Sequence, residues 1–235
     1  MNDLIIDIVY EDNHIVVVNK PVNVPSQADV SGDVDMLSMV KQYIKEKYEK
    51  PGDVYIGLVH RLDRPAGGLM VFARTSKAAS RLSEQMRSKK IVKKYLAVVS
   101  GICPVGDGVT RLEGYIEKDS TTNKVAVYDI KKGDAKFAAL EYECLQCASP
   151  LSLVRVSLET GRPHQIRAQM AHAGLPLYGD QKYGDGRVGQ QLALWSNQLS
   201  FAHPVTQEVL NFVSPPPQET QPWRVFSTLR QTALL

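Results

Sequence analysis

Apolar positions in the first 90 residues follow two different spacings, which predict strands and helices in turn. Residues 5–10 and 14–18 are short apolar runs joined by a polar turn, and the second run ends at Lys20-Pro21 because proline cannot donate to a strand ladder. Residues 35–49 carry apolar side chains at helical spacing, and Lys50-Pro51-Gly52 ends that helix. Further strands are predicted over 54–59 and 69–73, and a helix over 77–90 with Ser76 as its cap.

The remaining sequence predicts mostly strands. They are expected near 94–100, 109–117, 124–129, 136–146 and 151–158, with a short helix over 163–173, a hairpin over 201–209 and a terminal helix around 223–229. Strands outnumber helices and do not alternate strictly with them. This pattern is typical of an α+β fold with a mixed, largely antiparallel central sheet flanked by helices and loops. No clear linker interrupts the chain, so a single domain over residues 1–235 is expected.

Composition narrows the class of protein only moderately. The chain has 235 residues, of which 43% are hydrophobic and 23% charged, and this is enough to bury a core without disulfides or a structural metal. A net charge of +3 permits a nucleic-acid partner without demanding one. The three cysteines are an odd number, the first residues do not resemble a secretory signal, and no apolar run approaches the roughly 20 residues of a membrane span. A reduced, cytoplasmic protein without a membrane partner is expected.

One loop between two predicted apolar strands carries candidate chemistry. It runs from His60 to Gly68 and contains Asp63 between Arg61 and Arg64. A nearby guanidinium keeps a carboxylate ionised, and an ionised, partly desolvated carboxylate can act as a nucleophile or a base. The alternative interpretation is an ordinary surface loop with a salt bridge.

Three further segments accompany this loop in a fixed order. They are Asn19-Lys20-Pro21, Lys93-Lys94-Tyr95 and Gly161-Arg162-Pro163-His164-Gln165-Ile166-Arg167. Together with His60-Arg61-Leu62-Asp63 and the apolar strand from Gly68, they resemble the RluA family of pseudouridine synthases, with matching order and spacing from about residue 8 to 213. Four ordered motifs are a specific signal, although each alone is weak.

The resemblance implies a pseudouridine synthase fold with the active-site cleft across the sheet. It also implies an isomerase that converts a uridine of ribosomal and/or transfer RNA to pseudouridine with Asp63 as catalytic carboxylate. Tyr95 would stack on the target uracil and help to remove its C5 proton, and Arg167 would pair with Asp63. Uracil leaves C1′ through N1, rotates and rejoins through C5, so the reaction needs no cofactor and no metal. Asp63 could attack the sugar, add to uracil C6 or abstract a sugar proton, and the sequence does not choose among these routes.

Further residues take substrate-binding roles by the same resemblance. Arg61 would fill the gap that the flipped uridine leaves in the RNA, and Leu177 would support the pocket wall. The other expected substrate contacts are His60, Arg64, Lys93, Arg162 and His164. Flipping the base out costs a few kcal/mol, and stacking on Tyr95 at about 1–3 kcal/mol per base would offset part of that cost.

The sequence departs from the family pattern at two places. Ala66 and Gly67 stand where the family often has a hydroxyl residue before the motif glycine, and Gln169 stands where it often has histidine. The first change concerns hydrogen bonds of the loop, and the second concerns a polar contact near the pocket and hence substrate preference. The family often adds an S4-like RNA-binding module, which the early first strand leaves no room for, and the resemblance suggests a monomer without an obligate protein partner.

A basic stretch precedes Tyr95. Residues 81–94 hold six basic side chains against Glu84 alone, a local charge of +5. Concentrated positive charge is a better sign of an RNA partner than the net charge of the whole chain. The alternative interpretation is a solvated helix end whose cations favour the helix C-terminus.

Other patterns carry less weight. Residues 184–189 fit G-x-G-x-x-G but follow no apolar strand, so dinucleotide binding is not expected there. Cys144 and Cys147 fit C-x-x-C without a second pair for zinc, and are interpreted as core residues. His164 and His172 share a helix without the arrangement of a metalloprotease.

Two rival functions remain open from the sequence. A non-catalytic RNA-binding protein on the same scaffold would keep its RNA affinity without Asp63. A small-molecule hydrolase using Asp63 would need a second acid or base, for which His60 is the local candidate, and would leave the basic stretch unexplained.

Overall fold

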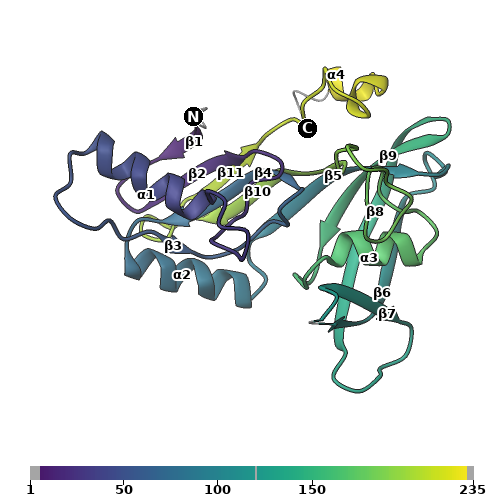
Figure 1. The fold of residues 1–235 in the computed structure, drawn as a ribbon, viewed down its shortest axis with the longest axis horizontal. Helices are drawn as coiled ribbons and strands as arrows, with labels where there is room; N and C mark the ends of the chain where they lie inside the picture. The colour runs from purple at the N-terminus through teal and green to yellow at the C-terminus, as the bar shows by residue number, and fades with distance from the viewer. Residues whose placement is uncertain (1–5, 120, 232–235) are drawn as a thin grey trace. The chain divides into compact units, whose positions relative to one another are not determined.

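The computed structural model describes residues 6–119 and 121–231, and within them the chain divides into two compact units. Unit 1 comprises the chain to Val92 together with Ser196–Ser214, and unit 2 comprises Lys93–Trp195 and the chain from Pro215. Both units are built mainly from antiparallel strands with few helices, as the α+β prediction requires (Figure 1). Ile5, with which the first predicted strand begins, lies outside the described residues.

Unit 1 has a sheet in the order β1-β2-β4-β10, with β3 beside β4 and β11 beside β10. The central strand β4 is buried along its whole length, so both of its faces are covered. Helix α2 packs Ala78 and Leu82 against Val17 and Val71 of the sheet. The elements are β1 (Asp7–Glu11), β2 (Ile15–Lys20), α1 (Met36–Lys47), β3 (Gly57–Leu58), β4 (Gly67–Ala73), α2 (Ser76–Arg87), β10 (Leu194–Ala202) and β11 (Val209–Val213).

Unit 2 has a second run of antiparallel strands in the order β5-β9-β8-β6-β7. Helix α3 packs Ala168 against Ile116, Val125 and Ala138 of these strands, and Figure 1 shows it lying across them. Trp223 and residues after it close a second core over β5. The elements are β5 (Val92–Ser100), β6 (Val109–Asp119), β7 (Lys124–Tyr128), β8 (Lys136–Ala148), β9 (Leu151–Leu158), α3 (Gln165–His172), a 3₁₀ turn η1 (Trp223–Val225) and α4 (Thr228–Gln231).

Three sequence predictions are wrong in detail. The strand over 54–59 is reduced to Gly57–Leu58, because Val54 and Ile56 are buried by packing without pairing in a ladder. The helix cap is Thr75, whose side chain accepts from Ala78 N, and that helix ends at Arg87 because Lys89 turns into the left-handed region at φ +56°. The terminal helix is split into η1 and α4 by the extended backbone of Phe226.

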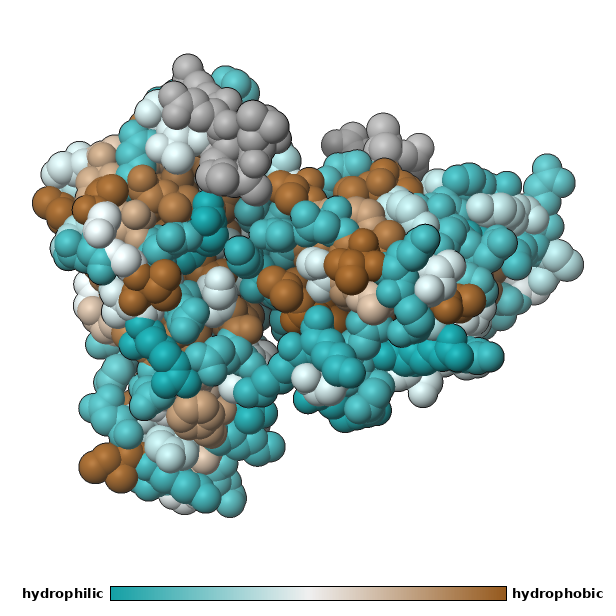
Figure 2. All heavy atoms as spheres, turned by 180° about the vertical axis from the view of Figure 1, so that it is seen from behind, coloured by the Kyte–Doolittle hydropathy of each residue, from teal (hydrophilic) through white to brown (hydrophobic). Residues whose placement is uncertain are grey.

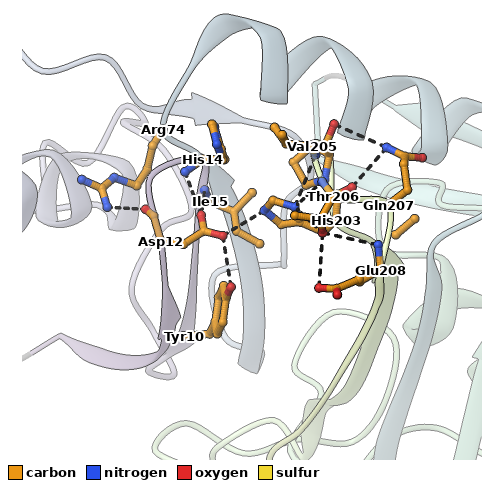
Figure 3. Close-up of polar contacts among 12 residues, drawn as sticks. Tyr10, Asp12, His14, Ile15, Arg74, His203, Val205, Thr206, Gln207 and Glu208 are labelled. Carbon is orange, nitrogen blue, oxygen red and sulfur yellow. Dashed lines mark hydrogen bonds and ion pairs between the residues drawn. The ribbon is translucent and has the colours of Figure 1, made fainter.

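The hairpin predicted over 201–209 is longer and is shifted along the chain. Its strands are β10 and β11, and residues 203–208 form the turn between them. His203 in this turn is buried, and its Nε2 lies 2.9 Å from Asp12 Oδ2 in the turn between β1 and β2 (Figure 3). The other carboxylate oxygen of Asp12 accepts the N–H groups of His14 and Ile15 at 2.7 and 2.8 Å. Asp12 therefore organises its own turn and joins it to a turn almost 200 residues later.

Hydrophobic surface is scattered. Figure 2 shows brown patches interrupted by hydrophilic residues on the face that it presents. The most exposed large hydrophobics, Val30, Ile130 and Val188, lie in three different loops. Isolated exposed apolar residues are normal for a globular surface. No helix in residues 6–119 and 121–231 is long and apolar enough to cross a membrane.

Candidate active site

Asp63 lies in unit 1 on the loop between β3 and β4, as expected. Its side chain is half-buried, and its carbonyl accepts the N–H of Ala66 at 3.0 Å, which closes a turn. At the start of the loop, His60 Nε2 accepts the N–H of Val71 at 3.0 Å and so takes the place of a strand partner for β4. The carboxylate is thus presented by a loop with a fixed backbone.

The end of the same loop requires a glycine. Gly68 has φ +105°, and a Cβ at this position would lie 2.4 Å from the carbonyl oxygen of Ser196 on β10. Ser196 also donates its hydroxyl to the carbonyl of Leu69 at 3.0 Å. A residue with a side chain would push β4 and β10 apart or rotate the loop. Ala66, the departure from the family pattern, is buried, so an apolar side chain suits this turn.

The two arginines beside Asp63 have different surroundings. Arg61 is exposed. Arg64 forms ion pairs with Asp29, at 3.7 Å, and with Asp33, and it donates to Ser31 Oγ at 2.9 Å. These ion pairs are themselves exposed, and such pairs contribute little stability, so an RNA phosphate can compete for Arg64. Substrate contact by His60, Arg61 and Arg64 stays a prediction.

In unit 2, Tyr95 lies on β5 opposite Val156 of β9 and is 6% exposed. Lys93, two residues earlier, lies against Gly161, the first residue of the Gly161–Arg167 motif. A Cβ on Gly161 would be 3.4 Å from Lys93 Nζ. Burial lowers the pKa of Lys93. The structure therefore brings the Lys-x-Tyr motif next to the Gly-Arg motif, which follows it by more than 60 residues.

The segment from Gly161 into α3 is held by Gln165. Its side-chain oxygen accepts from Arg162 N at 2.9 Å and from Thr160 Oγ1 at 2.8 Å, and its amide donates to Ala139 O at 3.0 Å. His164, in the left-handed region at φ +51°, is the N-terminal boundary of α3. Arg162 itself is exposed, and its Nε donates to a backbone carbonyl of β8. The tight turn sets where the following helix directs its side chains.

Arg167 of α3 forms a two-pronged ion pair with Asp180. Its Nε lies 2.8 Å from Oδ2 and its Nη2 lies 2.8 Å from Oδ1, and the two side chains are 5% and 0% exposed. Burial alone would raise the pKa of Asp180, but hydrogen bonds from Arg167 and from the N–H groups of Lys182 and Tyr183 lower it. The guanidinium is therefore rigid and charged, as a partner for a second carboxylate must be. Arg167 belongs to unit 2 and Asp63 to unit 1, and the predicted pair between them stays a prediction.

Tyr183 links three parts of unit 2. Its hydroxyl accepts the N–H of Val125 on β7 at 2.8 Å and lies 2.8 Å from His164 Nδ1. Its ring lies beside the guanidinium of Arg167, 5.2 Å from centroid to Cζ. Such a cation–π contact favours the charged arginine. His164 and Arg167 are thus positioned by the same aromatic residue.

Leu177, expected in the pocket wall, is 1% exposed and bridges to Val99 of β5. Two residues later Gly179 has φ +75°, and a Cβ there would lie 2.3 Å from the carbonyl of Gln191. Gln169, where the family often has histidine, is buried and donates to Ala138 O at 3.2 Å. The contacts of Leu177 and Gly179 fix the segment that carries Asp180, and the contact of Gln169 ties α3 to β8.

The sequence motifs assign no role to Asp180 or Tyr183, which lie in the glycine-punctuated segment 175–184. A usable signal was present, because a single aspartate among glycines and aromatic residues in such a loop is suited to accept backbone N–H groups. Its partner Arg167 could not be read from the sequence, because the pair depends on the fold of unit 2.

The basic stretch is only partly available for RNA. Arg81 donates to the carbonyl of Pro204, and Arg87 pairs with Glu84 on its own helix. Lys89 and Lys90 are exposed beyond the end of α2. Of the four basic side chains that α2 and its end contribute to this stretch, Lys89 and Lys90 are therefore the candidates for phosphate contacts.

The three cysteines lie together in unit 2 as free thiols. The Sγ atoms of Cys144 and Cys147 are 3.8 Å apart, and both donate to the carbonyl of Cys103. Burial raises the pKa of Cys144 to about 12, so its thiol is a poor nucleophile. In the described part of the chain no group of three or more His, Cys, Asp or Glu is arranged to hold a metal ion.

Comparison with known proteins agrees with these motifs. A family model described as RNA pseudouridylate synthase matches residues 14–172, which include Asp63, Tyr95 and Arg167. Ribosomal large subunit pseudouridine synthase D of Neisseria meningitidis is 34% identical over 97% of this chain, and the matched chain spans 62% of that relative's length. The RNA pseudouridine synthase YjbO of Bacillus subtilis is 35% identical over 91% of this chain and 74% of its own.

Solved structures agree on the fold. Human RNA pseudouridylate synthase domain containing 4 superposes with a TM-score of 0.74 at 22% identity, covering 91% of this chain and 89% of its own. Human RNA pseudouridylate synthase domain containing 1 gives 0.70 at 21% identity, covering 96% and 95%. With the family model matching well over half of its residues, the chain belongs to the RNA pseudouridylate synthase family.

Proposed function

We propose that this protein isomerises uridine to pseudouridine in RNA, with Asp63 as the catalytic carboxylate. The observation that carries the proposal is the family match over residues 14–172, which contains the Asp63 loop and the motifs of Tyr95 and Arg167 in family order. Both units contribute residues in this proposal, as parts of one catalytic domain in the cytoplasm. The substrate is ribosomal or transfer RNA, and the protein acts as a monomer without a cofactor.

The roles of the residues follow from their chemistry. Asp63 is half-buried on a fixed turn, which suits a carboxylate that must approach one atom of a flipped nucleotide. Tyr95 presents an aromatic ring for stacking on uracil. Arg167, held rigid by Asp180, pairs with Asp63 and keeps it charged. Lys89 and Lys90 contact phosphates.

The test measures release of tritium from RNA labelled at uracil C5. The C5 hydrogen must depart when C5 becomes the glycosidic carbon, so release reports the reaction itself. We expect release by the wild-type protein and none by Asp63→Asn. Asp53→Asn serves as the matched control, because Asp53 is an exposed carboxylate of the same unit.

Binding assays separate the main rival from the proposal. If neither wild type nor Asp63→Asn releases tritium from pooled ribosomal and transfer RNA, yet both bind RNA equally, the protein is an RNA-binding protein on this scaffold. Equal release by wild type and Asp63→Asn would instead refute the role of Asp63 and leave the reaction to another group.

A further inference from the structure

Lys20, the last residue of β2, is a lysine with none of its surface exposed. Burying an ammonium is costly unless its donors are satisfied. Its Nζ donates to three backbone carbonyls, those of Val24 at 2.6 Å, Pro21 at 2.9 Å and Arg64 at 3.0 Å. An ammonium has three N–H donors, whereas a neutral amine has two. Three carbonyl acceptors therefore match the charged form of Lys20.

The segment that begins at Lys20 holds the catalytic loop on both sides of Asp63. Ser26, which is buried, donates its hydroxyl to the carbonyl of Leu62 at 2.8 Å and accepts the N–H of Leu62 at 3.1 Å. Lys20 reaches the carbonyl of Arg64. The residue before Asp63 and the residue after it are thus both fixed to the same short segment.

Lys20 also acts on this loop through its charge. Burial lowers the pKa of Lys20 to about 7, the Asp63 carboxylate opposes that shift, and Arg64 adds to it. A charged Lys20 therefore places a positive charge that the carboxylate of Asp63 attracts. Ser26 provides a similar backbone restraint without any charge, which gives a natural comparison within the same segment.

We propose that Lys20 is a positioning residue for Asp63, whose buried ammonium fixes the Arg64 carbonyl and places a positive charge beside the catalytic carboxylate. The proposal rests on the proposed function, because it concerns the same reaction. It adds a role for the Asn-Lys-Pro segment, for which the motif comparison suggested none.

The experiment measures single-turnover tritium release against pH for wild type, Lys20→Gln and Ser26→Ala. Glutamine has no charge and only two N–H donors for the three carbonyls that Lys20 contacts. Lys45→Gln is the matched control, since Lys45 is exposed on the last turn of α1. Backbone hydrogen exchange over residues 60–66 is measured on the same four proteins, and circular dichroism checks that each variant is folded.

For the wild type, we expect the single-turnover rate constant to fall as pH rises through about 7, because Lys20 loses its proton. Lys20→Gln should be about 10- to 100-fold slower at neutral pH, the loss associated with a misplaced catalytic group, and should lack the alkaline decline. Ser26→Ala should be slower but keep the decline, and Lys45→Gln should match wild type. Exchange in the loop should be faster in both Lys20→Gln and Ser26→Ala.

Three results would overturn the proposal. The first is a pH profile of the release rate for Lys20→Gln that matches the wild-type profile. The second is a Ser26→Ala profile that loses the alkaline decline as the Lys20→Gln profile does. The third is backbone hydrogen exchange over residues 60–66 that is the same in Lys20→Gln as in Lys45→Gln. The exchange result stands even if wild type releases no tritium. Absence of release from wild type would count against the proposed function, whereas release with unchanged Lys20→Gln kinetics would count against the role of Lys20 alone.

Discussion

Replacing Asp180 with asparagine would remove the buried carboxylate that accepts two hydrogen bonds from the guanidinium of Arg167. Breaking a buried ion pair by removing one partner costs about 3–5 kcal/mol. Asparagine can still accept the N–H groups of Lys182 and Tyr183 that Asp180 accepts, so the lower value is expected, about 3 kcal/mol. With a urea slope of about 2–3 kcal/mol/M for a protein of this size, the unfolding midpoint should fall by about 1 M.

Tryptophan fluorescence is the suitable assay. Both tryptophans, Trp195 and Trp223, belong to unit 2, so their emission reports the unit that holds the pair. Asp185→Asn is the control, because Asp185 is an exposed carboxylate of the same segment. The pKa of Asp180 is lowered in the folded state, so its contribution is present above the unfolded pKa and disappears as pH falls through the folded value. A midpoint for Asp180→Asn equal to that of Asp185→Asn at neutral pH would refute the reasoning.

Three other changes have defined outcomes. Gly68→Ala should lower the free energy of unfolding by about 3 kcal/mol, because the added Cβ meets a backbone oxygen of β10 at 2.4 Å. Gly32→Ala should cost only about 1 kcal/mol in the same urea titration, since Gly32 has φ +72° but open space around it, and equal costs would contradict the clash. Asp12→Asn should lower the free energy of unfolding by about 1 kcal/mol at neutral pH, because it weakens the contacts of the carboxylate with His14, Ile15 and His203. In acid titrations the difference in unfolding free energy between wild type and Asp12→Asn should vanish as pH falls through the lowered pKa of Asp12. A difference that persisted below that pKa would show that the charge of Asp12 is not its cause. Replacing Lys89 and Lys90 with glutamine should reduce the salt dependence of RNA binding by up to about two ion equivalents, and an unchanged slope would exclude both from phosphate contact.

The positions of helices and strands could be predicted from the sequence where the spacing of apolar residues matches the way that the segment packs in the fold. The strand over 151–158 was predicted with the bounds that β9 has, and the helix over 35–49 corresponds to α1. Residues 54–56 show where this prediction is wrong. Val54 and Ile56 are buried in the core, as their apolar side chains indicate, but their backbone does not pair in a strand. The predicted cap at Ser76 is wrong for a smaller reason: Thr75 and Ser76 are adjacent hydroxyl residues that both fit the capping preference, and only the backbone geometry selects Thr75.

The candidate site residues could be predicted from sequence motifs, whereas the residues that hold them in place could not. Asp63 and Arg167 stand in recognisable sequence patterns. The roles of Lys20, Ser26 and Asp180 depend on contacts between segments 13 to 44 residues apart, which no local periodicity encodes. Lysine is also rarely fully buried, so the sequence alone favours an exposed Lys20.

The central claim is tested most directly by identifying the product nucleoside. Unmodified ribosomal and transfer RNA would be incubated with wild type or Asp63→Asn, digested to nucleosides and separated by chromatography, since uridine and pseudouridine have the same mass. The account predicts pseudouridine from wild type and none from Asp63→Asn at equal protein and RNA concentrations. Pseudouridine formed equally by both proteins, or by neither with either class of RNA, would contradict it.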